Sequence, residues 1–301
     1  MMSLSLLDYI TNAFNSKEML ETARLHEAAF TRNRSMPFSN ALYFMLDMRT
    51  TTLQTRLNMF FNHNGGDPIS QQAFSKLRAN FDHSPFETTV RGLVNEEYSG
   101  KHPLTIWNGY HLLGVDGSYL QLPRVDNLRS EFGVRGGDTC PMAGISVLFD
   151  VLHGWALDPI LVDAYMNERV QLEKHVEFLH RELPDVAKKT ILLLDRGYPS
   201  KDLFKKLQES CLKFVARCKK GFAKAADEAP IGDTMVTLKN GVSVRIVKFE
   251  LESGEIETLA TNLFHLPAEA IIELYALRWG IETMYFKLKQ ELCVEKFTGY
   301  R

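Results

Sequence analysis

The hydrophobic pattern of the chain changes its period near residue 105, and this change constrains the fold more than any other feature. Up to that point apolar residues recur with helical spacing, and Ser39 and Ser70 each follow an apolar residue in the arrangement of a helix cap. After a stretch with Gly100 and Pro103, short runs of alternating apolar residues predict strands. We therefore expect a helical domain over residues 1–105 and an α/β domain over residues 106–301.

The second part predicts three strands, a helix, a strand, a helix and a strand, an order typical of a mixed α/β sheet. These elements are expected at 110–122, 144–152, 157–165, 168–183, 190–194, 200–210 and 212–217. A β insertion is predicted at about 221–263, because Asn240-Gly241 between two alternating runs is a strong hairpin signal. A long helix is expected from Pro267 to about Leu292.

Composition limits the class of protein and its compartment. The 301 residues are 45% hydrophobic and 24% charged, as in ordinary globular proteins. The four cysteines form no CxxC pair, and neither a signal peptide nor an apolar run of about 20 residues is present. We expect a soluble cytoplasmic protein without a membrane partner. Because the formal net charge is −2, a polyanion would have to bind at a local basic patch.

Two aspartates occupy strand positions that are typical of functional sites, one within a predicted strand and the other at the end of one. Asp116 lies within a predicted strand before Gly117-Ser118, and Asp195 follows the apolar run Ile191-Leu192-Leu193-Leu194. A carboxylate after such a run must be solvated, paired or bound to a metal, since burial of an unpaired charge is costly. For either aspartate alone, a solvated strand end or a turn cap explains the residue equally well.

The last predicted helix carries a polar stripe beside its apolar face. At 100° per residue, Tyr275, Arg278, Glu282 and Lys289 fall within an arc of about 60°. The alternative to a functional stripe is a polar helix face that is simply exposed to solvent and contains an Arg278–Glu282 ion pair. The combination of a tyrosine, two cations and a carboxylate nevertheless suits a phosphate backbone beside a metal ion.

These four residues, at these spacings, resemble the Tyr-Arg-Glu-Lys signature of a branch of bacterial insertion-sequence DDE transposases. Asp116-Gly117-Ser118 and Asp195-Arg196-Gly197-Tyr198 are similar to the first and second aspartate motifs of that branch, in the same order. The resemblance covers residues 110–290 firmly and the helical part only loosely.

The resemblance implies a ribonuclease-H-like catalytic domain, a mixed sheet with a β-strand insertion before the last catalytic helix. Asp116, Asp195 and Glu282 would be catalytic and would hold two Mg²⁺ or Mn²⁺ ions, which prefer oxygen ligands. The implied reaction is cut-and-paste transposition, with cleavage of the element ends through a DNA hairpin and joining to target DNA by a homodimer in a synaptic complex. The expected location is the bacterial nucleoid. Since members of the branch usually extend further beyond this glutamate, we expect a chain truncated at its carboxyl end.

Contacts with DNA are expected at both aspartate and glutamate motifs and at a basic segment. Residues 196–224 hold nine basic and two acidic side chains. Part of this charge lies on a predicted helix, where exposure to solvent is sufficient to explain it. The residues expected to bind DNA are Tyr275, Arg278, Lys289, Arg196, Tyr198, Lys219 and Lys220. We expect the helical amino-terminal part to bind the element ends, although a bundle with solvated charges fits it as well.

Two other functions remain open at this point. A DNA-binding transposase remnant would bind DNA but would not cleave it, and a metal-dependent nuclease would cleave it without joining ends. Outside the motifs, His175 is expected at a helix surface and Trp279 in buried packing.

Overall fold

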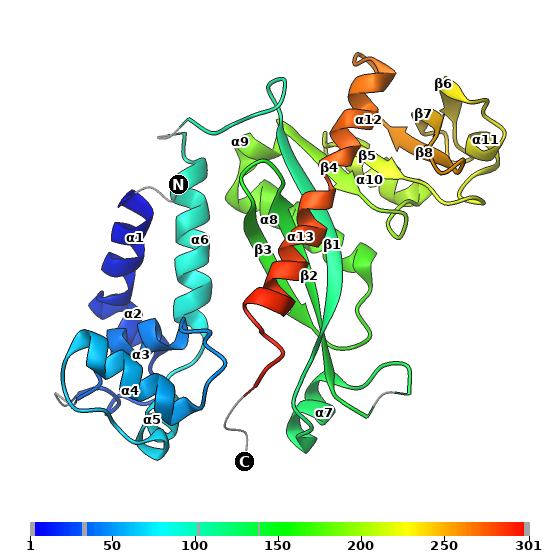
Figure 1. The fold of residues 1–301 in the computed structure, drawn as a ribbon. Helices are drawn as coiled ribbons and strands as arrows, with labels where there is room; N and C mark the ends of the chain where they lie inside the picture. The colour runs from blue at the N-terminus through cyan, green and yellow to red at the C-terminus, as the bar shows by residue number, and fades with distance from the viewer. Residues whose placement is uncertain (1–3, 32–34, 101–102, 138, 298–301) are drawn as a thin grey trace. The chain divides into compact units, whose positions relative to one another are not determined.

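The computed structural model describes residues 4–31, 35–100, 103–137 and 139–297 (Figure 1). The chain divides into two compact units. One consists of Met1–Lys101 with Leu288–Arg301, and the other of His102–Lys287. None of the helices in the described ranges has both the length and the apolar character of a membrane span.

The described residues of the first unit form six α-helices around an aromatic core. They are α1 (Leu4–Phe14), α2 (Lys17–Ala23), α3 (Phe38–Met45), α4 (Leu53–Asn64), α5 (Gln71–Arg78) and α6 (Ser84–Tyr98). Phe44 and Phe74 meet edge to face, with ring centroids 4.7 Å apart. The Ser70 hydroxyl caps α5 by accepting the Ala73 N–H at 3.2 Å, as predicted.

The predicted cap at Ser39 is wrong. Helix α3 begins one residue earlier, at Phe38, and Pro37 occupies the cap position with an extended backbone and no side-chain hydrogen bond. Phe38 is buried in the aromatic core, so packing of this ring sets the start of the helix.

The second unit is built on one mixed sheet, with strand order β3-β2-β1-β4-β5-β8-β7-β6. The strands are β1 (His111–Gln121), β2 (Met142–Asp150), β3 (Trp155–Val162), β4 (Thr190–Leu194), β5 (Lys213–Arg217), β6 (Gly232–Thr237), β7 (Ser243–Glu250) and β8 (Ile256–Thr261). β1, β4 and β5 are parallel, whereas β2 and β3 continue one side and β8, β7 and β6 the other in antiparallel pairs. The predicted mixed α/β fold with a β insertion is therefore confirmed, and the insertion extends the main sheet.

Helices connect and cover this sheet. They are α7 (Asp126–Phe132), α8 (Glu168–Glu182), α9 (Pro184–Ala187), α10 (Lys201–Glu209), α11 (Lys224–Asp227), α12 (Ala268–Ala276) and α13 (Trp279–Phe286), followed by the π-helical turn η1 (Lys287–Glu291). Figure 1 shows α13 running across β1 and β2. A Cβ placed on Gly114 of β1 would meet Ile281 of α13, and one placed on Gly117 would meet Met166 just before α8. Because positions 114 and 117 point to opposite faces of a strand, α13 and the start of α8 lie on opposite faces of the sheet.

The expectation of one continuous helix from Pro267 to Leu292 is wrong. The helix is interrupted at Leu277 and Arg278, between α12 and α13, although neither residue is a helix breaker. The Arg278 side chain is buried there, with 3% of the residue exposed, so tertiary contacts override the local preference for a straight helix. Trp279, expected in buried packing, is 62% exposed at the start of α13.

Candidate active site

The strand register places Asp116 beside Asp195. In the parallel pair β1 and β4, Val115 is aligned with Leu194, and an aspartate follows each of these residues. β4 ends at Leu194, whereas β1 continues to Gln121. The chain after β4 therefore leaves the sheet next to Asp116, at the carboxyl ends of the parallel strands where sites gather in α/β folds.

Helices α12 and α13 contact both aspartates through tyrosine hydroxyls. The Tyr275 hydroxyl donates to Asp195 Oδ1 at 3.3 Å, and the Tyr285 hydroxyl donates to the Asp116 carbonyl oxygen at 2.8 Å. Glu282 precedes Tyr285 by three residues, on the same helix. The segment that carries the third predicted carboxylate thus packs directly on the strand that carries the first.

Arg278 links the acidic residues of this region. Its Nη2 donates to Glu282 Oε1 at 2.7 Å, and its charge also acts on Asp116 and Asp195. The Glu282 side chain is 40% exposed, whereas that of Arg278 is 4% exposed. Glu282 is therefore held by a buried cation and turned partly toward solvent.

Asp116 is a buried carboxylate among other carboxylates. Its pKa is raised from 3.8 to about 6, mainly by burial and to a smaller extent by Asp195 and Glu168, against the lowering effects of the Gly117 N–H and Arg278. Burial, together with Asp195, also raises the pKa of Glu168. Buried carboxylates close to one another favour a proton or a metal cation.

Glu168 is a carboxylate of this site that the sequence reasoning missed. It is the first residue of α8, after Asn167, whose side chain caps the helix by accepting the N–H groups of Arg169 and Val170. An acidic residue in a first helical turn is explained by the helix dipole alone, so the sequence gave no reason to select it. The glycines at 117 and 197, which leave room for it, are the one signal that pointed to a crowded place.

The other predicted contact residues divide into exposed and buried groups. Arg196, Lys219 and Lys220 are exposed, as DNA contacts require. Tyr275 and Arg278 are buried and engaged with the carboxylates. These two therefore lie under the site rather than at its surface.

Tyr198 does not fit its predicted contact with DNA. Its side chain is 1% exposed, because the tight turn in which the Tyr198 N–H bonds to the Asp195 carbonyl directs the ring inward. Lys289 lies in η1, beyond the second unit, and is partly buried. Its contact with DNA stays a prediction.

The donor chemistry of the site fits a hard divalent cation. Asp116, Asp195 and Glu282 supply only oxygen donors, the ligands that Mg²⁺ and Mn²⁺ prefer. Across the described ranges, no three His, Cys, Asp or Glu side chains are close enough together to hold a metal ion. Glu282 is instead paired with the Arg278 guanidinium, which supplies positive charge there.

A buried Ser-His-Asp chain lies elsewhere in the same unit. His175 Nε2 is 2.9 Å from Ser146 Oγ, and its Nδ1 is 2.7 Å from Asp158 Oδ2. Ser146 and His175 are both 0% exposed, so the surface position expected for His175 is wrong. A substrate cannot reach this serine, and the chain is a structural link between α8 and the sheet, not a hydrolase triad.

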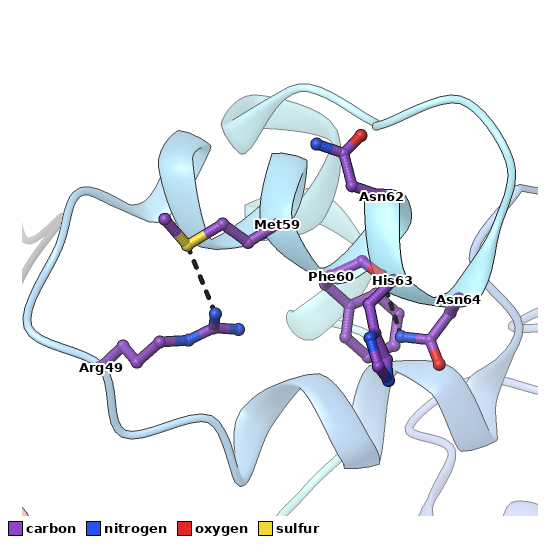
Figure 2. A pocket seen from close by; sticks show the side chains of 6 residues that line it. All are labelled: Arg49, Met59, Phe60, Asn62, His63 and Asn64. Atoms are coloured by element: carbon purple, nitrogen blue, oxygen red, sulfur yellow. Dashed lines mark hydrogen bonds between the residues drawn. The ribbon is translucent and has the colours of Figure 1, made fainter.

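A pocket in the helical unit offers less chemistry. Its volume is about 480 Å³, and Figure 2 shows Arg49, Met59, Phe60, Asn62, His63 and Asn64 around it. Arg49 is already engaged with the Asp47 carboxylate, and the Asn64 amide donates to the Phe60 carbonyl at 2.8 Å. The carboxylate cluster is therefore the stronger candidate for catalysis.

Comparison with known proteins agrees with this choice. No curated protein matches the chain. Among solved structures, a piggyBac transposase synaptic complex with hairpin DNA is similar in fold, with a TM-score of 0.56 and 13% identity over 98% of this chain and 69% of that one. The family model described as a transposase DDE domain matches residues 107–300. Since this match spans well over half of the sequence and contains all three predicted carboxylates, the chain belongs to the transposase DDE domain family.

Proposed function

We propose that this protein is a bacterial insertion-sequence transposase of the Tyr-Arg-Glu-Lys branch, with Asp116, Asp195 and Glu282 as its catalytic carboxylates. The observation that carries the proposal is the convergence of three chain segments. β1 and β4 end their pairing at the two aspartates, and Tyr285 of the Glu282 helix donates to the Asp116 carbonyl at 2.8 Å.

The three carboxylates would hold two Mg²⁺ or Mn²⁺ ions. When bound, such a pair activates a water or a DNA 3′-hydroxyl and stabilises the departing oxygen of a phosphodiester displacement. The residues of this chain position the ligands. Tyr275 orients Asp195 by its hydrogen bond, and Arg278 retains Glu282 at the edge of the site.

Exposed cations beside the site would bind the phosphate backbone. Arg196 follows Asp195 directly, and Lys219 and Lys220 follow β5, the strand next to β4. Because contacts of this kind release counterions, DNA affinity should fall steeply with rising salt. The similarity to a transposase structure that contains hairpin DNA supports DNA as the substrate and is compatible with a hairpin pathway.

The reaction we propose has four stages at one site. The enzyme nicks an element end, joins the freed 3′-hydroxyl to the opposite strand as a hairpin, reopens the hairpin, and transfers the end to target DNA. A homodimer would hold two terminal inverted repeats in a synaptic complex, in association with the nucleoid. The amino-terminal helices would contribute contacts with these repeats.

Cleavage of a labelled element end by the full chain tests the proposal. We expect Mg²⁺-dependent cleavage by the parent and none by Asp116→Asn, Asp195→Asn or Glu282→Gln. Glu177→Gln removes the same type of charge from an exposed position on α8 and serves as the matched control. Equal cleavage by the parent and the three site variants would contradict the assignment. Salt-sensitive binding without cleavage would identify a DNA-binding remnant, and cleavage without joined products would identify a nuclease.

A further inference from the structure

Glu168 reaches the site from the face of the sheet opposite to α13. A Cβ built on Gly197 would lie 2.4 Å from Glu168 Oε2, and one built on Gly117 would lie 3.7 Å from Glu168 Cγ. Its carboxylate therefore lies over the backbone of the turn that follows Asp195, and its stem lies beside the residue that follows Asp116. Only glycine at position 197 leaves room for this arrangement.

Only distant charges within the protein stabilise this carboxylate. The charges of Arg135 and Arg169 lower the pKa of Glu168, but burial and Asp195 raise it on balance, and Glu168 forms no hydrogen bond or ion pair with any residue of the described ranges. The neighbouring Arg169 is committed elsewhere, since its guanidinium donates to the Tyr198 and Pro199 carbonyl oxygens at 3.0 and 3.1 Å. A partly buried carboxylate without a direct hydrogen bond or ion pair is costly, unless a bound group completes its surroundings.

The Tyr198 hydroxyl independently indicates such a group. Its side chain is 1% exposed, and its oxygen has no hydrogen-bond partner in the part of the chain that the structure describes. Burial raises the pKa of this hydroxyl most, and Asp116, Glu168, Tyr285 and Asp195 raise it further, so the hydroxyl lies within range of all three carboxylates. A buried donor left unpaired beside acceptors marks a place where an oxygen ligand is missing.

We propose that Glu168 is a fourth carboxylate of the catalytic centre and that it moves together with Asp116 and Asp195 to bind a divalent cation, because in the described ranges no three such side chains lie close enough to hold an ion without moving. This inference rests on the proposed function, because it assigns a further ligand to the same site. Beyond Val115, β1 is paired with β2 alone, because β4 ends at Leu194, so the edge of β1 at Asp116 has no neighbouring strand on the side of Asp195. Asp116 lies on the α13 face of the sheet at this edge, and Glu168 approaches the edge from α8 on the other face.

Binding of Mn²⁺ to the full chain without DNA, measured by titration calorimetry, tests the inference. In metalloproteins, loss of a residue that only hydrogen-bonds to a metal ligand already weakens metal binding by about 10 to 100 times. Loss of a ligand by Glu168→Gln should therefore weaken Mn²⁺ binding at least about tenfold. Gly197→Ala should do the same with all charges intact, because its Cβ displaces the Glu168 carboxylate. Glu177→Gln, about 13 Å further along the same helix, should bind as the parent does.

Two comparisons separate the possible failures. If Asp116→Asn abolishes Mn²⁺ binding but Glu168→Gln and Gly197→Ala bind as the parent does, the inference is wrong and the proposed function stands. If Asp116→Asn also binds as the parent does, the proposed site itself is wrong. A purely structural role at the start of α8 would appear as a lower thermal midpoint of Glu168→Gln with unchanged Mn²⁺ affinity. This outcome would likewise overturn the inference.

Discussion

Asp116→Asn should stabilise the metal-free protein at neutral pH. Burial, Asp195 and Glu168 raise the pKa of Asp116 from 3.8 to about 6 in the folded chain. The folded state therefore binds more protons than the unfolded state between these values, so the stability contributed by this group falls as the pH rises from about 4 to about 6. Because a shift of one pKa unit corresponds to 1.36 kcal/mol, the ionised Asp116 lowers the free energy of unfolding by about 3 kcal/mol above pH 6.

Replacing the carboxylate by an amide removes this cost and keeps an oxygen that can accept the Gly117 N–H, now bonded to Asp116 Oδ1 at 2.8 Å. For a unit of this size, 3 kcal/mol corresponds to a rise of the thermal midpoint by about 6–12 °C. The assay is thermal unfolding of parent and Asp116→Asn with a chelator at pH 4 and pH 8. The gain should be present at pH 8, and at pH 4 it should be much smaller. A variant that is no more stable at pH 8, or that gains equally at both pH values, would refute the electrostatic reasoning.

Three further outcomes follow from the contacts. Tyr285→Phe removes the hydrogen bond to the Asp116 carbonyl and should cost about 1–3 kcal/mol in urea unfolding, because a buried acceptor loses its donor; unchanged stability would count against this contact. His175→Leu breaks a buried chain at both ring nitrogens and should cost at least about 2 kcal/mol by the same measurement, with a smaller loss arguing against the network. Replacing both Lys219 and Lys220 by alanine should lower the slope of log affinity for DNA against log salt by up to about 2, and an unchanged slope would exclude both as phosphate contacts.

Strong local patterns made most of the sheet predictable. Thr190–Leu194 is fully apolar and buried on both faces, and its boundaries agree with the predicted strand. β8 was missed as a separate strand because its register is fixed by distant pairing, with Val215 of β5 aligned with Thr261. His175 carried a signal that was not used, since Leu172, His175 and Leu179 share one helical face and all three are buried.

The site was predictable only in part, because some of its contacts are set by residues that are distant in the sequence. The order and spacing of the two aspartates and Glu282 indicated the family, and local spacing indicated the Arg278–Glu282 pair, but no local pattern showed that Arg278 would be buried at a break in the helix. That break invalidates the single helical wheel on which a common stripe with Lys289 was based. Glu168 was invisible because its placement against Gly197 is a tertiary contact between residues 29 positions apart.

Anomalous diffraction from a crystal grown with Mn²⁺ would locate the cations at the carboxylate site without any assay of activity. We expect anomalous density between the carboxylates of Asp116 and Asp195, with Glu282 released from Arg278 toward it. Density confined to other acidic residues, or none at these aspartates at a concentration that supports DNA cleavage, would show that these carboxylates do not bind the metal.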